Sequence, residues 1–133
     1  MAEVGQAEAG QAVSFYLHPE SAQAFSPDNR FVTRLYKSAA SEILIVCWEP
    51  GQKSSTHSHG ESESIVMVLE GKMKVRTGEQ ERVLSKYEIV ITPRGMTHQM
   101  TNDPSCRSVT LHIYAPSTKT PVSQPFRDLS PQI

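Results

Sequence analysis

The chain has 133 residues, of which 38% are hydrophobic and 20% are charged, and these proportions are typical of one ordinary globular domain. Thirteen Lys and Arg residues against 14 Asp and Glu residues give a formal charge of -1 without a run of one sign, so we expect no nucleic acid partner and no membrane partner. The longest apolar run, residues 43–48, is far shorter than the roughly 20 residues that cross a bilayer, and residues 1–10 lack a signal pattern. We therefore expect a cytoplasmic protein in which Cys47 and Cys106 stay reduced.

The composition divides the chain into three parts. Residues 1–14 are predicted to be a flexible N-terminal segment, because they begin with a small, polar stretch that lacks an apolar period. Residues 15–115 are predicted to form the single folded domain. Residues 116–133 carry four prolines, which exclude a regular helix and favour an extended tail lying on the surface.

The folded part is predicted to be all-β. The best helix candidate is a weak segment at residues 19–25, and no helical period persists elsewhere in this part. Turn signals such as Pro50-Gly51 and Glu70-Gly71 separate short strands. The predicted strands are residues 30–37, 42–49, 54–59, 64–69, 72–77, 82–84, 88–92, 98–101 and 107–114. Many short strands at even spacing indicate a closed or double-sheet structure in which the strand edges are paired.

Three of the five histidines form a candidate metal site. His57 and His59 are two residues apart in a predicted strand, so both rings would project from one face. His98 begins a later strand, after a turn at residues 93–95 that lets the chain fold toward the first pair. Three neutral imidazoles facing one cavity bind a divalent first-row metal and leave coordination positions open for catalysis. The spacing alone also permits a solvated pair, His57 and His59, on a polar loop.

Two segments resemble the motifs of the cupin family. Gly51, five further residues, His57, Ser58 and His59 resemble the first motif, which a downstream glycine completes at Gly71. Residues 93–102, Pro-Arg-Gly-Met-Thr-His-Gln-Met-Thr-Asn, resemble the second motif at every defining position. The leading glycine of that motif is replaced by Tyr87. The resemblance implies a single-domain cupin jelly-roll barrel with a metal at its mouth.

Residues 47–52 and 108–114 resemble the corresponding stretches of cysteine dioxygenases. This resemblance implies an enzyme in which iron(II), held by His57, His59 and His98, inserts both atoms of O2 into a small thiol and gives a sulfinic acid. Cysteine or a related mercapto acid or aminothiol would be the substrate. Nickel, zinc or copper can replace the iron in the purified protein. In mammalian members a cysteine at the position of Ser64 cross-links to the tyrosine matching Tyr114, so no such cross-link is expected here.

Many cupins add a glutamate to the three histidines. Counting forward from His59 selects Glu63 for this position, whereas counting back from Gly71 selects Ser64. The uninterrupted strand at residues 65–69 fixes the register and favours the backward count. We therefore expect a site of three histidines, with Glu63 on a loop or pointing to solvent.

Thr110, His112 and Tyr114 alternate along one predicted strand and therefore share a face. They resemble the Ser-His-Tyr relay of cysteine dioxygenases, which implies that the Tyr114 hydroxyl approaches a metal ligand while His112 orients it and Thr110 lies behind. The alternative is a half-buried strand whose polar tips reach water. Arg34 resembles the substrate arginine of the same family, and its planar guanidinium is suited to a carboxylate.

The leading functional hypothesis is an iron(II)-dependent thiol dioxygenase. The alternative is a small metal-binding cupin of another class, either a different non-haem metal enzyme or a non-catalytic ligand-binding domain. A homodimer is a further expectation, because cupins often dimerise through edge strands.

Overall fold

The computed structural model describes residues 13–119 and 121–131, and over these ranges it consists of strands and one short 3-10 helix. In chain order the elements are η1 (Pro19–Ala22), β1 (Phe31–Lys37), β2 (Glu42–Trp48), β3 (Glu63–Glu70), β4 (Met73–Thr77), β5 (Gln80–Leu84), β6 (Ile89–Thr92), β7 (His98–Asn102), β8 (Ser108–Ala115) and β9 (Phe126–Asp128). The predicted all-β class is confirmed. The described part of the chain contains no helix that is long and apolar enough to cross a membrane.

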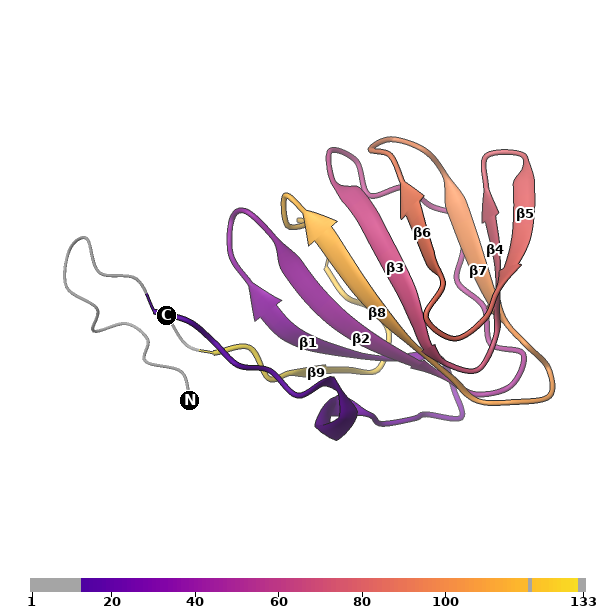
Figure 1. The fold of residues 1–133 in the computed structure, drawn as a ribbon, viewed down its shortest axis with the longest axis horizontal. Coiled ribbons are helices and arrows are strands. Elements are labelled where there is room, and N and C mark those ends of the chain that lie inside the picture. Colours follow the sequence, from indigo (N-terminus) through magenta and orange to yellow (C-terminus); the bar gives the residue numbers. More distant parts are fainter. Residues whose placement is uncertain (1–12, 120, 132–133) are drawn as a thin grey trace.

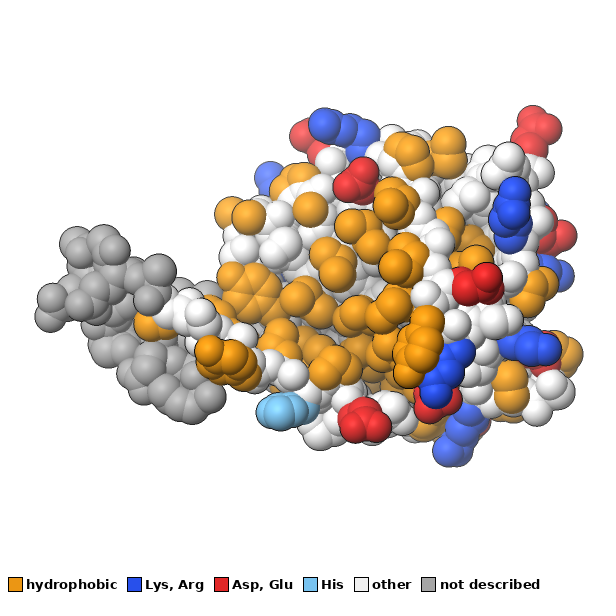
Figure 2. Space-filling view, viewed as in Figure 1, with side chains coloured by type: hydrophobic (Ala, Val, Ile, Leu, Met, Phe, Trp, Pro, Cys, Tyr) orange, Lys and Arg blue, Asp and Glu red, His pale blue; other side chains and the backbone are white. Residues whose placement is uncertain are grey.

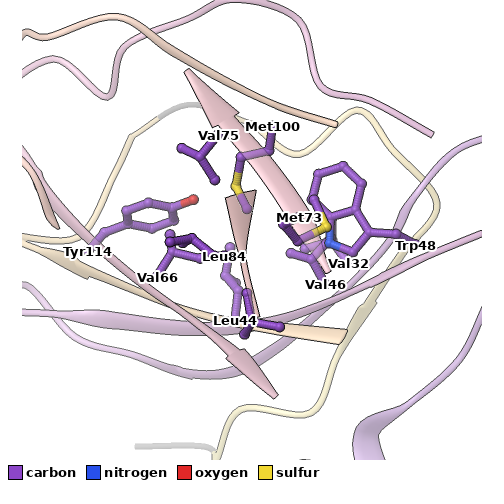
Figure 3. Packing of buried hydrophobic residues seen from close by; sticks show 11 residues of the cluster. Val32, Leu44, Val46, Trp48, Val66, Met73, Val75, Leu84, Met100 and Tyr114 are labelled. Carbon is purple, nitrogen blue, oxygen red and sulfur yellow. The ribbon is translucent and has the colours of Figure 1, made fainter. Parts of the chain in front are cut away.

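The strands form two sheets with a shared apolar core. One sheet has the strand order β6-β3-β8-β2-β1-β9, and the other has the order β5-β4-β7 (Figure 1). Inward side chains of both sheets meet in one cluster (Figure 3). Its buried members are Val32, Leu44, Val46, Trp48, Val66, Val68, Met73, Val75, Leu84, Met100 and Tyr114. This architecture is the predicted single-domain jelly roll.

Strand β2 is apolar on both faces because each face is covered. Val46 and Trp48 point into the core between the sheets. Ile45 and Cys47 point to the outer side, where Ala22 of η1 and neighbouring apolar residues of the N-terminal segment pack on them. A strand buried on both faces has a continuous apolar sequence, which explains residues 43–48.

Two motif residues close one end of the barrel. Gly71 has φ +85°, and a Cβ atom at this position would overlap Ser108 Oγ, so only glycine fits the β3–β4 turn. Asn102, at the end of β7, donates from Nδ2 to the carbonyl of Glu49 at 2.9 Å and to the carbonyl of Cys106 at 2.8 Å. The motif residues that are not histidines therefore fix the turns that position the two sheets.

The prediction of a strand at residues 54–59 is wrong. This segment touches the edge of β7 through two isolated bridges, Lys53 with Thr101 and His57 with His98. Between the bridges the Ser55 carbonyl lies 2.7 Å from Nδ1 of the His57 ring. The Ser55 carbonyl thus bonds to a side chain and not to the backbone of β7, so the segment between the bridges forms a loop and not a strand. Eight of the nine predicted strands correspond to β1–β8.

The C-terminal segment contributes to the barrel, which the sequence did not indicate. Its strand β9 pairs in parallel with β1, with Val32 opposite Phe126 and Arg34 opposite Asp128. Val32 also donates its backbone N–H to the carbonyl of Pro125 at 2.9 Å. The predicted surface tail thus extends the large sheet by one strand. At the other end, residues 1–12 of the predicted flexible segment lie outside the described residues.

Tyr87, which replaces the leading glycine of the second motif, has φ +70°. A residue with a Cβ atom loses about 1–2 kcal/mol in this left-handed region. The Tyr87 side chain is 67% exposed, and the centre of its ring lies 5.2 Å from Lys86 Nζ. This contact adds little stability at an exposed site.

We expect Tyr87→Gly to raise the free energy of unfolding by about 0.5–1 kcal/mol, measured by urea denaturation. Tyr87→Phe keeps the backbone cost and serves as the control. An unchanged or lower stability of the glycine variant would contradict the prediction.

Candidate metal centre

Three histidine side chains meet at one end of the cavity between the sheets. The candidate ligand atoms of His57, His59 and His98 all lie within 4.8 Å of one another. His57 and His98 face each other across their bridge, with backbone N–H to carbonyl distances of 3.0 and 2.8 Å in the two directions. The structure therefore brings the three predicted residues together, although His57 and His59 lie on a loop.

The nitrogen atoms of this cluster fit a divalent metal. His59 Nε2 and His98 Nδ1 are buried and have no hydrogen-bond partner among the described residues. The neutral His57 ring can donate from Nδ1 to the Ser55 carbonyl, which leaves its Nε2 lone pair free as a ligand. Burial, followed by the charges of neighbouring histidines, lowers the pKa of His59 to about 3 and that of His98 to about 4. These two rings are therefore neutral at pH 7, the state that binds metals.

Glu63 does not join this group. It is exposed at the start of β3, and it does not line the cavity. Ser64 points inward, is only 2% exposed and stands opposite Tyr114 in the β3–β8 register. This is the register that counting back from Gly71 predicts, so the site carries three imidazoles and no carboxylate among the described residues.

Thr110, His112 and Tyr114 project inward from β8 as one hydrogen-bonded line. Thr110 Oγ1 lies 2.7 Å from His112 Nε2, and His112 Nδ1 lies 3.3 Å from the Tyr114 hydroxyl. Trp48 donates from Nε1 to Thr110 Oγ1 at 2.9 Å. The centre of the Tyr114 ring lies 4.3 Å from the centre of the His59 ring. All three side chains are at most 6% exposed and their polar atoms bond to one another, whereas the alternative interpretation placed them on a half-buried strand.

Burial determines the protonation of this line. It lowers the pKa of His112 to about 3, with further lowering by the charges of the other cavity histidines. It raises the pKa of Tyr114, and the nearby Glu42 charge acts in the same direction. At pH 7 the imidazole is therefore neutral and the phenol keeps its proton.

The three histidines, His112 and Tyr114 line a cavity of about 260 Å³. One wall comes from the C-terminal segment, through residues 121–124. Glu42, buried at the start of β2, fastens this segment by accepting bonds from the backbone N–H and the hydroxyl of Thr118 at 3.1 and 2.9 Å. The prolines of the segment gave no indication that it returns to the site.

Arg34 does not line this cavity. Its guanidinium donates to Glu42 at 3.2 Å and to Asp128 at 2.8 Å, so two carboxylates already neutralise it. Arg34 therefore lies outside the cavity that holds the three histidines, whereas the resemblance implied a place beside the substrate. The sequence pattern could not show that two carboxylates would converge on Arg34.

The arginine at the cavity is Arg30, immediately before β1. Its guanidinium carbon lies 5.5 Å from the centre of the Trp48 ring. Its Nη1 has two long contacts, at 3.4 Å to Asn29 Oδ1 and 3.5 Å to the Lys53 carbonyl. No carboxylate of the described residues lies within ion-pair distance, and burial lowers the pKa of Arg30 without removing its charge. The cavity thus contains an unneutralised cation.

Comparison with solved structures supports the fold. The protein TT1209 of Thermus thermophilus is 24% identical, with a TM-score of 0.73 over 77% of this chain and 97% of that chain. The KdgF protein of Halomonas sp. is 19% identical, with a TM-score of 0.69 over 80% of this chain and 96% of that chain. An oxalate oxidase in complex with the substrate analogue glycolate is 21% identical, with a TM-score of 0.69 over 90% of this chain and 66% of that chain.

The family is shown by a match of the amino-acid sequence. The sequence model of the cupin domain family matches residues 44–114, which are more than half of the sequence and run from β2 to β8. The matched region contains the three clustered histidines, Gly71 and Asn102, whose geometry is described above. This chain belongs to the cupin family.

Proposed function

We propose that this cupin is an iron(II)-dependent thiol dioxygenase that oxidises a small, carboxylate-bearing thiol to its sulfinic acid. The observation that carries the proposal is the hydrogen-bonded line of Thr110, His112 and Tyr114, which ends beside a cluster of three histidines without a carboxylate. A cavity of about 260 Å³ suits a ligand much smaller than a drug molecule.

The ligand set favours a thiolate. Three neutral imidazoles leave the full positive charge on a bound divalent ion, so an anionic sulfur is attracted and its deprotonation is favoured. A carboxylate ligand would offset part of that charge. When bound, iron(II) supplies the redox chemistry through which O2 reacts with a thiol. The overall conversion, R–SH plus O2 to R–SO2H, balances without another reductant, because sulfur loses the four electrons that the two oxygen atoms gain.

The hydrogen bonds around His112 orient a proton donor toward the metal cluster. In the proposed arrangement Trp48 N–H donates to Thr110 Oγ1, and the Thr110 hydroxyl donates to His112 Nε2 at 2.7 Å in preference to the Val46 carbonyl at 3.4 Å, because the shorter contact is the stronger one. The neutral ring then carries its proton on Nδ1 and donates to the Tyr114 oxygen. The Tyr114 hydroxyl is left to donate into the cavity, where it can hold an oxygen or sulfur atom of the reactants.

Arg30 is the anchor for the substrate carboxylate in this proposal. It lines the same cavity as the histidines and lacks a carboxylate partner among the described residues. A guanidinium held on the face of Trp48 can form two parallel hydrogen bonds with a carboxylate. A substrate carrying a thiolate at one end and a carboxylate at the other would therefore span the cavity between the metal and Arg30.

The proposal is tested by oxygen consumption after anaerobic loading with iron(II). Cysteine, 3-mercaptopropionate and cysteamine are compared, with the sulfinic acid product identified by mass spectrometry. Uptake of one O2 per sulfinic acid formed supports the proposal. If no thiol is consumed, the chain is a metal-binding cupin of another class.

Arg30→Gln is expected to raise the Michaelis constant for carboxylate-bearing thiols by roughly 10- to 100-fold, the effect of losing a charge-assisted hydrogen bond. Cysteamine has no carboxylate, so its Michaelis constant should change little. Arg82→Gln is the matched control, because Arg82 is exposed on β5 of the other sheet and does not line the cavity. An equal effect of Arg30→Gln on both kinds of thiol would remove Arg30 from substrate binding.

A further inference from the structure

The inner side of the large sheet carries an ion pair among apolar side chains. Arg34 stands opposite Leu44 and Glu42 opposite Tyr114, so both charged side chains face the apolar cluster between the sheets. The outer side of the same sheet differs, because its charged side chains lie mainly around the margin (Figure 2). Arg34 Nε lies 3.2 Å from Glu42 Oε2. A buried ion pair is weak evidence for stability by itself, so its further partners indicate its role.

The carboxylate of Glu42 obtains most of its hydrogen bonds from the C-terminal segment. Glu42 is 1% exposed, and it accepts bonds from the backbone N–H and the hydroxyl of Thr118 as well as from Arg34. Lys37 Nζ donates in turn to the Thr118 carbonyl at 3.1 Å. A buried carboxylate that loses its donors keeps the full cost of leaving water. Glu42 and Thr118 therefore stabilise each other at these positions.

Arg34 attaches the same segment further along the chain. Its Nη1 donates to Asp128 Oδ2 at 2.8 Å, and its carbonyl accepts a bond from the backbone N–H of Leu129 at 2.9 Å. Its guanidinium carbon also lies 5.1 Å from the centre of the Phe126 ring. The ion pair is thus connected to the C-terminal segment on both sides of residues 121–124.

Residues 121–124, between these two attachments, form one wall of the cavity. Within this wall Val122 is partly buried and packs against the apolar cluster between the sheets. The three clustered histidines and Arg30 line the same cavity. A ligand that reaches from the histidines toward Arg30 therefore shares its space with Val122, and the position of Val122 limits how long that ligand can be.

We propose that Val122 determines the length of the ligands that the cavity accepts, and that Arg34 and Glu42 are positioning residues that hold it in place. This inference rests on the proposed function only for the class of ligand, which is a small mercapto acid. Arg34 does not touch the ligand and acts through the attachments of the C-terminal segment. A short acid such as 3-mercaptopropionate fits the cavity of about 260 Å³, whereas the longer 6-mercaptohexanoate meets Val122.

The fluorescence of Trp48 tests the wall without any ligand or metal. Trp48 is the single tryptophan of the chain, lines the cavity and is 1% exposed. In Glu42→Gln the amide NH2 group faces a donor of either Arg34 or Thr118, so one attachment of the wall is lost. We expect acrylamide to quench Trp48 about twofold more strongly in this variant, because a segment with fewer buried bonds opens more often. Circular dichroism verifies that the variant is folded.

Asp128→Asn is the second variant, because the Asp128 side chain is 41% exposed and its replacement leaves the buried Glu42 intact. It weakens only the attachment to Arg34 and should raise the quenching by a smaller factor. Glu81→Gln is the matched control, since it removes a carboxylate from an exposed ion pair with Lys74 on the other sheet and should leave the quenching unchanged. Unchanged quenching in both Glu42→Gln and Asp128→Asn would overturn the positioning role.

The limit on ligand length is tested by calorimetric titration of the zinc-loaded chain, because zinc has no redox chemistry and leaves a bound thiol unoxidised. The affinity for 3-mercaptopropionate is compared with that for 6-mercaptohexanoate. Val122→Ala shortens the wall and should improve the affinity for the longer acid, relative to the shorter one, by about 10-fold, the effect of a methylene-sized change in an apolar pocket. Glu42→Gln should shift the ratio of the two affinities in the same direction.

Val90→Ala is the matched control for ligand length. Val90, like Val122, is partly buried and packs against the apolar cluster, but it does not line the cavity. Its replacement should leave the ratio of the two affinities unchanged. An unchanged ratio in Val122→Ala would overturn the role of Val122, even if the iron-loaded chain oxidises thiols. If the ratio shifts in Val122→Ala but the iron-loaded chain oxidises neither acid, the proposed function fails and the role of Val122 is supported.

Discussion

Replacement of His98 by alanine is expected to abolish metal retention and to leave the barrel folded. His98 supplies one of three clustered donors, and loss of a mere hydrogen-bond partner of a ligand already costs roughly 10- to 100-fold in affinity. Loss of the ligand itself should therefore weaken metal binding by more than about 100-fold. The bonds that hold His98 to His57 use backbone atoms, at 2.8 and 3.0 Å, and alanine preserves them. Metal content after gel filtration measures the effect.

His18→Ala is the control for this experiment. His18 is exposed, lies before η1 and does not belong to the histidine cluster. It should retain metal like the natural chain. Circular dichroism of both variants verifies the fold. If the His98 variant holds the natural amount of metal after gel filtration, the three histidines are not the metal site.

The histidine cluster was predictable because it depends on short-range sequence and on one turn. Residues two apart in an extended segment project to the same side whether the segment forms a ladder or only isolated bridges, so His57 and His59 converge even though no strand is formed. The shared face of Thr110, His112 and Tyr114 was equally predictable, because alternate residues of a strand face the same side of its sheet. In both cases backbone geometry alone determines the direction of the side chain.

The arginine that lines the cavity was not predictable in the same way. Arg30 and Arg34 are four residues apart, and the sequence context of Arg34 resembles a known motif more closely. What distinguishes them is long-range: Asp128 comes from β9, far along the chain, and Glu42 comes from β2, and together they neutralise Arg34. The same segment that brings Asp128 also forms a wall of the cavity. A parallel pairing between a Pro-flanked segment and β1 has no local sequence signature.

The fold without its metal is expected to lose stability as the pH falls from about 6.5 to about 5. Histidine in an unfolded chain has a pKa near 6.5, whereas burial lowers the pKa of His112 to about 3, that of His59 to about 3 and that of His98 to about 4. Between these values the unfolded chain binds protons that the folded chain excludes. The stabilisation is therefore fully present above about pH 6.5 and is progressively lost as the pH falls toward the folded-state pKa values.

The fully buried His112 provides the sharpest measurement of this effect. The proton difference between the unfolded and folded states grows from about one half at pH 6.5 to nearly one at pH 5, so the loss over this range is about 1.6 kcal/mol, before His59 and His98 add to it in the same direction. Urea denaturation of the metal-free chain at pH 7.5, 6.5, 5.7 and 5.0 gives the slope. His112→Gln cannot bind the proton in either state, so its slope should be shallower by about 0.7 kcal/mol per pH unit at pH 6.5 and by about 1.3 kcal/mol per pH unit at pH 5.0. Equal slopes of unfolding free energy against pH for the two chains would mean that His112 is protonated as readily in the barrel as in water. The neutral ring that orients Tyr114 would then be absent at mildly acidic pH.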